Sequence, residues 1–283
     1  SGGVMLPQMM NMIADYPVKE YGFHSVQAVQ LMTEIERRAY ADRAKYLGDA
    51  DFYTVPVATL TSKAYAKERM RTYEPMKAGS SAATQAGIIP ESEETTHLSV
   101  YDKEGNAVSV TTTLNGSYGS HTVVGGAGFL LNNEMDDFSV KPGVPNMYGA
   151  LGADANAIAP GKRMLSSMTP TIVLKDNQPY IIVGTPGGTT IITSVFQTLI
   201  NMLEFDMSTE DAVNKPKFHH QWLPDEIAVE KDFPQEVREQ LLQLGYTIRE
   251  RGSIGRTEVI RIWPDGKIEA VADKRGDDHA AGY

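Results

Sequence analysis

Residues 91–101 read ESEETTHLSVY, and the hydrophobic periodicity of the chain changes inside this stretch, at Thr95. From there on, Thr96–Tyr101 and Ala107–Leu114 alternate between polar and apolar residues, as half-buried strands do. The segment between them, Asp102–Asn106, contains the polar residues and the glycine of a hairpin turn. We therefore expect an antiparallel hairpin that starts next to Thr95.

The sequence before this stretch has the spacing of helices. Ser25 is suited to cap a long helix, in which apolar residues recur every three or four positions on one face: Ala28, Leu31, Ile35 and Ala39. We expect a helix near Pro7 as well, and a more charged helix over Ser62–Thr72.

The segment Pro75–Glu94 has no periodicity, is rich in Gly, Ser and Pro, and ends in acidic residues. This composition predicts an exposed linker. A structureless linker of about twenty residues is unusual inside a compact domain and is often functional. Its far end, at Thr95, is therefore a candidate functional position.

The remainder of the chain alternates short strand patterns with helical ones. The expected elements are a strand over Phe129–Leu131, a hairpin over Thr171–Lys175 and Tyr180–Thr185, an apolar helix after Gly187-Gly188, a short helix capped by Ser208, a helix over Pro234–Leu244, and a hairpin over Thr257–Trp263 and Lys267–Val271. Strand pairs interspersed with helices predict an α+β fold with antiparallel sheets covered by helices.

The composition excludes several classes of protein. The chain has 283 residues and a net charge of -10. It contains no cysteine, so disulfides and thiolate chemistry are excluded. No apolar run approaches the roughly 20 residues of a membrane span. The acidic balance argues against a nucleic-acid partner. The chain begins Ser1-Gly2-Gly3 without Met, and we expect it to be part of a longer protein.

Several common site motifs are missing from the sequence. The glycine-rich segment 184–190 lacks the lysine of a phosphate-binding loop, and neither GxSxG nor HExxH occurs. The adjacent pair His219-His220 would point to opposite faces of a strand and is a poor chelate. We therefore expect no metal site.

Thr95 meets a specific chemical need if the chain is cut before it. Its hydroxyl would then lie next to its own α-amine, whose ordinary pKa of about 8 suits it to accept the hydroxyl proton near neutral pH. Threonine with an N-terminal amine base is a known nucleophile–base pair. The alternative is that threonine stands here because β-branched residues favour strands.

A second signal is the charge of the segment that follows. Between Lys103 and Lys141 there is neither Lys nor Arg, whereas Glu134, Asp136 and Asp137 are acidic. A pocket lined by this segment would favour a substrate ammonium, although a solvated acidic loop has the same composition. Further along, the backbone amides at Gly187-Gly188, ahead of a helix, could hold an oxyanion.

Together these features resemble the γ-glutamyltranspeptidases, which are N-terminal-nucleophile hydrolases. The resemblance runs along the whole chain, and its stretches are Ala41–Arg43, Tyr46–Asp49, Thr95–His97, Thr111–Asn115, Leu131–Phe138, Lys141–Asn146, Leu165–Met168, Gly184–Gly188 and Phe218–Trp222. It implies the αββα sandwich of that superfamily, incomplete at the N-terminus.

The resemblance also implies the residues of the site. Thr95 is the expected nucleophile, which first cleaves the Glu94–Thr95 bond, and Thr113 is expected to support it. The other expected contacts are Asn115, Glu134 and Asp137 at the substrate α-amine, Ser166 and Ser167 at its α-carboxylate, Gly187 and Gly188 as the oxyanion hole, and Tyr148 in a lid loop. The implied reaction is transfer of the γ-glutamyl group of glutathione or a related donor to water or an amino acid or peptide acceptor, with no cofactor.

The same resemblance divides the chain. Residues 1–94 correspond to the end of a large subunit and residues 95–283 to a complete small subunit, so a preceding large-subunit segment is an expected partner. That segment would supply an arginine for the substrate α-carboxylate. Similar bacterial enzymes are exported, so a secreted or periplasmic location is expected.

Two alternatives remain at this point. One is a related acylase acting on β-lactam side chains or poly-γ-glutamate, which an assay comparing γ-glutamyl and glutaryl amides would distinguish. The other is a truncated scaffold without turnover.

Overall fold

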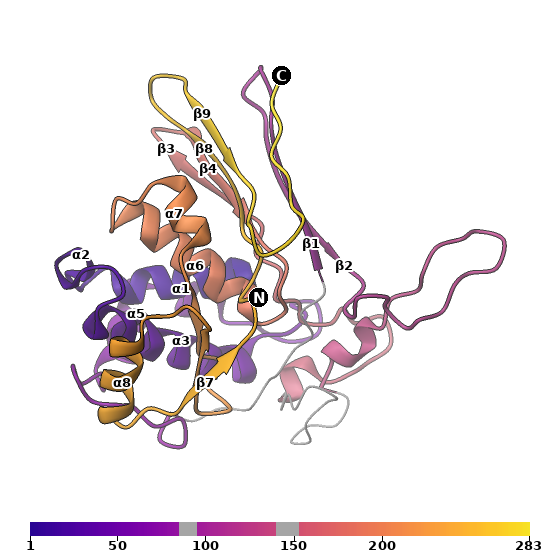
Figure 1. Ribbon diagram of the computed structural model, residues 1–283. Helices are drawn as coiled ribbons and strands as arrows, with labels where there is room; N and C mark the ends of the chain where they lie inside the picture. Colours follow the sequence, from indigo (N-terminus) through magenta and orange to yellow (C-terminus); the bar gives the residue numbers. More distant parts are fainter. Residues whose placement is uncertain (85–94, 140–152) are drawn as a thin grey trace.

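A layer of helices forms the base of the molecule in the computed structural model, which describes residues 1–84, 95–139 and 153–283 (Figure 1). These helices are α1 (Gly2–Ile13), α2 (Val18–Tyr21), α3 (Val26–Tyr46), α4 (Val57–Leu60) and α5 (Lys63–Met70). The predicted cap is confirmed, because the Ser25 hydroxyl accepts a hydrogen bond from the Ala28 amide at 3.1 Å. Likewise, Ser62 caps α5. The predicted apolar stripe of α3 is buried.

The hairpin predicted after the linker is confirmed. Strands β1 (Thr95–Tyr101) and β2 (Ala107–Thr113) pair antiparallel, with Thr95 opposite Thr113 and Tyr101 opposite Ala107. The turn closes because the Asp102 side chain accepts hydrogen bonds from the amides of Glu104 and Asn106, both at 2.9 Å. Thr95 therefore occupies the first position of the first strand.

A four-stranded antiparallel sheet has the order β3-β4-β8-β9. Its strands are β3 (Thr171–Lys175), β4 (Gln178–Gly184), β8 (Glu258–Ile262) and β9 (Ile268–Val271), and its neighbouring helices are α6 (Thr190–Leu203) and α7 (Thr209–Asn214). Ile181 and Val183 of β4 pack into the helical core. The intervening Ile182 points to the opposite face, as the alternation of a strand requires.

A third sheet was not predicted. Strands β5 (Phe218–His219), β6 (Ile227–Glu230) and β7 (Ile248–Arg251) form it beside helix α8 (Gln235–Gln243). The β6–β7 pair is parallel, which the sequence analysis did not anticipate, whereas the antiparallel sheets that it expected are present. The strand expected over Phe129–Leu131 was wrong, because only an isolated bridge between Val123 and Leu130 forms there. That segment projects from the body of the molecule (Figure 1).

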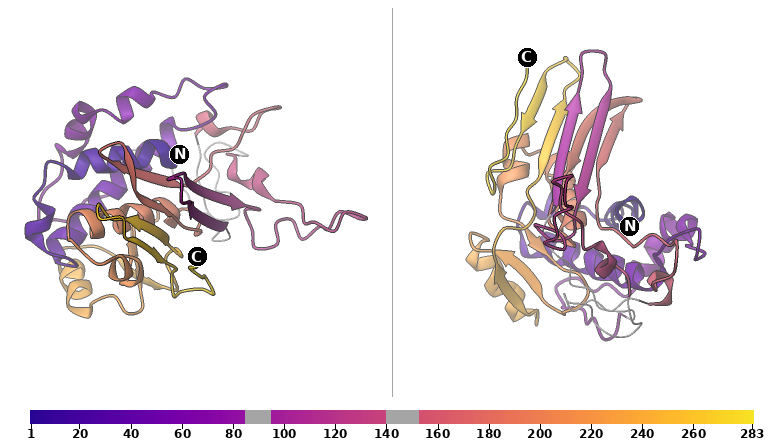
Figure 2. Two further views of the ribbon diagram at one scale, coloured as in Figure 1. Left: turned by 90° about the horizontal axis from the view of Figure 1, so that it is seen from above. Right: turned by 90° about the vertical axis from the view of Figure 1, so that its right-hand side faces the viewer.

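The hairpin lies over the four-stranded sheet on the side away from the helices (Figures 1 and 2). The Ser109 hydroxyl links the two layers, since it donates to the Val183 carbonyl and accepts from the Thr171 amide, both at 3.1 Å. The molecule thus has helices, a sheet and a second β layer, in agreement with an incomplete αββα sandwich.

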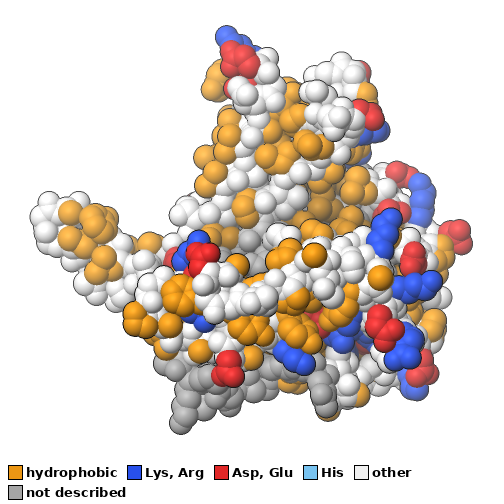
Figure 3. Space-filling model, turned by 180° about the vertical axis from the view of Figure 1, so that it is seen from behind, with side chains coloured by type: hydrophobic (Ala, Val, Ile, Leu, Met, Phe, Trp, Pro, Cys, Tyr) orange, Lys and Arg blue, Asp and Glu red, His pale blue; other side chains and the backbone are white. Residues whose placement is uncertain are grey.

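The outer face of the hairpin is apolar and exposed. Its side chains are those of Leu98, Val100, Val108 and Val110, each more than two-fifths accessible. Seen from behind, hydrophobic side chains gather over the strands in the upper part of the molecule (Figure 3). Among the described residues, no helix combines the length and apolarity that a membrane crossing needs.

Candidate active site

Thr95 and Thr113 face one another at the open end of the hairpin. They are opposite in the register, and their hydroxyl oxygens are 3.4 Å apart. An ordinary O–H···O hydrogen bond measures about 2.5–3.0 Å, so this contact must shorten before a proton can pass along it. A hollow of about 190 Å³ opens beside the pair, lined by Thr95, Thr96, Thr112, Thr113, Leu114, Gly116 and Ser117.

Asn115 connects this pair to the acidic segment. Its amide donates to the Thr113 hydroxyl at 2.9 Å, and its side-chain nitrogen donates to the Asn133 carbonyl at 3.2 Å. The Asn133 side chain in turn accepts from the Gly116 amide at 2.8 Å. Asn115 is buried with a φ of 70°, a left-handed conformation that asparagine tolerates better than most residues.

The acidic residues form one turn of 3₁₀ helix, η1 (Glu134–Asp137), directly after Asn133. Burial raises the pKa of Glu134 above its ordinary value. Because no Lys or Arg occurs between Lys103 and Lys141, this carboxylate is desolvated without a cation from its own segment. Such a group gains most from a positively charged ligand.

The paired serines are joined to this turn through Asn156. The Asn156 side chain donates to the Asp137 carbonyl at 2.7 Å and accepts from the Leu165 amide at 3.1 Å. Ser167 is buried, whereas Ser166 is half-buried. Two sets of hydrogen bonds, joined by the backbone of η1, therefore connect Thr113 to the edge of the serine pair.

Arg43 is a residue of this region that the sequence analysis did not assign. It lies on α3, is buried, and donates to the Ser167 hydroxyl at 2.9 Å. A positive charge thus stands behind one of the serines expected near a carboxylate. The sequence signal that could have identified it is an arginine within the helix that carries the apolar stripe. A buried arginine almost always has a polar or charged partner.

Gly187 and Gly188 lie on a separate loop between β4 and α6. Their carbonyls accept from the amides of Thr190 and Ile191, both at 3.1 Å. Both glycines are buried, and across residues 1–84, 95–139 and 153–283 neither donates its own amide N–H. Their φ values of 134° and 57° require glycine or strain, and they leave two donors available for an oxyanion.

His97 lies where β1 meets the end of β4, which leads into this loop, and the sequence analysis did not assign it a role. It shares the inner face of β1 with Thr95, and its ring contacts the hydroxyls of Thr111 at 2.8 Å and Ser99 at 3.0 Å. Burial lowers its pKa to about 4. A Cβ at Gly184 would approach the imidazole to 2.1 Å, so only glycine fits where β4 passes this ring.

The structure therefore joins some of the predicted residues and leaves others apart. Hydrogen bonds link Thr95, Thr113 and Asn115 to Asn133, the residue before η1, whereas Gly187 and Gly188 lie on the loop that follows Gly184, the residue beside His97. Glu94, Tyr148 and the stretch 141–146 lie outside the described residues. His219 and His220 are buried, and the described part of the chain contains no group of three or more potential metal ligands from His, Cys, Asp or Glu.

Comparison with known proteins gives a consistent result. Residues 1–283 match the family described as Gamma-glutamyltranspeptidase. The chain is 48% identical to the glutathione hydrolase proenzyme of Escherichia coli, covering all of this chain and 49% of that protein. Against the protein of the same name from Pseudomonas aeruginosa it is also 48% identical, over 98% of this chain and 50% of that protein. The chain thus spans about half the length of these relatives.

Solved structures agree. The T380A mutant of Helicobacter pylori γ-glutamyltranspeptidase superimposes with a TM-score of 0.62 and 51% identity, covering 64% of this chain and all of that one. A cephalosporin acylase from Bacillus halodurans covers this chain completely, and 49% of its own, at a TM-score of 0.81; at 24% identity it shows the fold alone. The chain belongs to the γ-glutamyltranspeptidase family.

Proposed function

We propose that this chain carries the nucleophile of a self-processing γ-glutamyl hydrolase and transferase, with Thr95 as that nucleophile. The observation that supports this proposal most directly is the placement of Thr95 at the first position of β1, opposite Thr113 and beside an open hollow. The relatives named glutathione hydrolase proenzyme support both the donor class and a precursor form.

Self-cleavage would begin with attack of the Thr95 hydroxyl on the Glu94 carbonyl carbon. The C–N bond breaks, its nitrogen takes the proton and becomes the α-amine of Thr95, and water hydrolyses the ester that remains. Before the cut this nitrogen is an amide and cannot act as a base, so the Thr113 hydroxyl is the neighbouring group available at that stage. The product would be residues 1–94 and residues 95–283.

In turnover the new α-amine would take the Thr95 hydroxyl proton. The oxygen attacks the γ-carbonyl of the donor, the donor amine leaves with a proton, and a γ-glutamyl ester remains on Thr95. Water or the amine of an amino acid or peptide then resolves this ester. We assign the oxyanion to the amides of Gly187 and Gly188, whose donors are otherwise unused in the described residues.

Recognition of the glutamyl group follows from the charges. We assign the substrate α-amine to Asn115, Glu134 and Asp137, since the desolvated Glu134 gains from a cation. We assign the α-carboxylate to Ser166 and Ser167, with Arg43 behind Ser167. Tyr148 as a lid residue, a preceding large-subunit segment as partner, and a secreted or periplasmic location remain parts of this proposal.

Incubation of the purified precursor, followed by a denaturing gel and an assay with a γ-glutamyl anilide, tests the proposal. We expect cleavage before Thr95 and release of the aniline, and Thr95→Ala should abolish both. Thr59→Ala, the same change at an exposed position of α4 outside the hollow, should leave both within a few-fold of the wild type. Cleavage at the same bond in Thr95→Ala would refute the assignment.

A further inference from the structure

A buried polar cluster outside the hollow beside Thr95 holds the last described segment before Thr95. Ser81 lies in the last described stretch before Thr95 and is only 1% exposed. All its polar groups bond to other parts of the chain. Its amide donates to the Asp225 carboxylate at 2.8 Å, and its carbonyl accepts from the Trp222 indole at 2.9 Å.

The Ser81 hydroxyl completes the set, because it donates to the Trp222 carbonyl and accepts from the Arg37 guanidinium. Arg37 also donates to the Asp225 carboxylate. We call Ser81, Arg37, Trp222 and Asp225 the Ser81 clamp. It joins α3, the segment before Thr95 and the turn after β5, three stretches far apart in the sequence.

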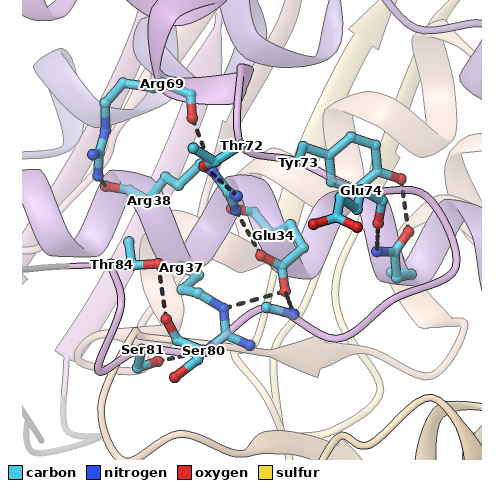
Figure 4. Close-up of polar contacts among 12 residues, drawn as sticks. Glu34, Arg37, Arg38, Arg69, Thr72, Tyr73, Glu74, Ser80, Ser81 and Thr84 are labelled. Atoms are coloured by element: carbon cyan, nitrogen blue, oxygen red, sulfur yellow. Dashed lines mark hydrogen bonds and ion pairs between the residues drawn. The ribbon is translucent and has the colours of Figure 1, made fainter.

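The residues on either side of Ser81 are held too. The Gly79 amide donates to Glu34 at 3.0 Å, and a Cβ at Gly79 would collide with the Glu34 carboxylate. After the clamp, the Ser80 carbonyl accepts from the amide and the hydroxyl of Thr84, both at 3.0 Å. Figure 4 shows Glu34 and Arg37 of α3 directed at this turn. The chain is therefore fixed as far as Thr84.

Asp225 is the member that connects this segment to residues 95–283. Its two carboxylate oxygens serve different partners, Oδ1 for Arg37 and Oδ2 for the Ser81 amide. The His220 ring also contacts Oδ1 at 3.4 Å, and its other nitrogen accepts from the Trp222 amide at 3.1 Å. Asparagine has the shape of aspartate, but its amide group would oppose either the guanidinium or the Ser81 amide with a second donor.

We propose that Asp225 is a positioning residue for self-cleavage, which acts through Ser81 by directing the segment that leads to the Glu94–Thr95 bond. This inference rests on the proposed function of Thr95. Asp225 belongs neither to the hollow beside Thr95 nor to the hydrogen bonds that connect Thr113 to the serines. We therefore expect its loss to slow the cut and to leave the later turnover unchanged.

The number of residues between the last fixed residue and Thr95 sets a lower limit on how much loss of the clamp slows self-cleavage. Thr84 precedes Thr95 by 11 residues, from the difference 95 − 84. Without the clamp, the next hold is the Glu34 carboxylate on the Gly79 amide at 3.0 Å, and Gly79 precedes Thr95 by 16 residues, or 95 − 79. Loop-closure entropy then lowers the encounter of the bond with Thr95 only about twofold. Loss of direction costs more, since catalytic steps depend steeply on orientation.

The experiment compares two rates in the full precursor. We expect Asp225→Asn to slow self-cleavage at least about tenfold, measured by gel densitometry over time. Once cleavage is complete, kcat/KM for a γ-glutamyl anilide should be within about twofold of the wild type. Asp232→Asn, the same chemical change at an exposed neighbouring position, should alter neither rate.

Each outcome decides the inference. Equal cleavage rates for Asp225→Asn and wild type overturn it, as does a matching loss of kcat/KM, which indicates general damage to the fold. If Asp225→Asn does not fold, Ser81→Ala is judged by the same two rates, with a several-fold slowing of cleavage alone expected. A wild-type precursor that does not cleave refutes the proposed function itself and is thereby distinguished from failure of the clamp.

Discussion

The two faces of the β1–β2 hairpin reverse the usual distribution of side chains. The inner face, against the four-stranded sheet, carries Thr95, His97, Ser99, Ser109, Thr111 and Thr113, whereas the outer face carries Leu98, Val100, Val108 and Val110. In most antiparallel sheets the apolar face is buried and the polar face meets water. Here the face that packs on the sheet is the polar one.

This difference separates two tasks. The inner face buries hydroxyl groups and an imidazole, which must hydrogen-bond to one another because they are shielded from water. These hydrogen bonds fix the positions of the side chains, as the contact between His97 and Thr111 shows. The outer face contributes apolar area that the described residues leave uncovered. An exposed patch of this kind commonly marks an interaction surface.

Removing the Thr113 hydroxyl should have the largest effect on the inner face. Thr113→Val keeps the shape but removes the hydroxyl that lies 3.4 Å from the Thr95 hydroxyl and accepts from the Asn115 amide. We expect self-cleavage and γ-glutamyl turnover to fall by about a hundredfold or more, as losses of preorganised polar groups do. The readouts are the gel and the anilide assay.

The controls for this variant come from the same strand. Thr113→Ser restores the hydroxyl and should recover most of both rates, and Thr112→Val makes the identical change on the opposite face. If Thr112→Val and Thr113→Val are equally slow, the contrast between the faces has no catalytic meaning.

His97 should give the inner face a measurable pH dependence. Burial lowers its pKa to about 4 from an ordinary 6.5, so the folded chain prefers the neutral ring. The stability from this ring is present above pH 6.5 and is lost as pH falls towards 4, at about 1.4 kcal/mol per pH unit. Denaturant unfolding of His97→Gln between pH 6 and 4.5 should show a slope smaller by about that amount; an unchanged slope contradicts the argument.

The smallest effect is expected on the outer face. Leu98 is 58% exposed, so Leu98→Ala should change the free energy of unfolding of this chain by no more than about 0.5 kcal/mol. Ile182→Ala, at a fully buried position of β4, should cost about 2–5 kcal/mol. A cost above about 2 kcal/mol at Leu98 would mean that the face is covered in solution, which dependence on protein concentration would reveal.

Local patterns in the sequence predicted much of this fold. The hairpin at Thr95 follows from alternation and a short turn, and the start of α3 follows from one capping serine. The third sheet was missed because β6 is a buried four-residue run whose parallel partner, β7, begins 21 residues later, as 248 − 227 gives. Neither periodicity nor turn composition reports such a pairing.

The site divides in the same way. Thr95 and the acidic turn could be found because each stands in an unusual local sequence. Arg43 and Asp225 could not be found from spacing, since each meets its partner across more than a hundred residues. Chain topology alone brings these groups together.

The position of the proposed cut relative to the β ladder has a consequence for maturation. All seven register pairs of the hairpin lie on the C-terminal side of the Glu94–Thr95 bond. Hydrolysis of that bond would cut the backbone without breaking any strand pairing of the hairpin. The new N-terminus would begin a strand that is already paired in register. Cleavage would add conformational entropy at the two new chain ends and would remove no hydrogen bond of the hairpin, so the cleaved form would be favoured over the precursor.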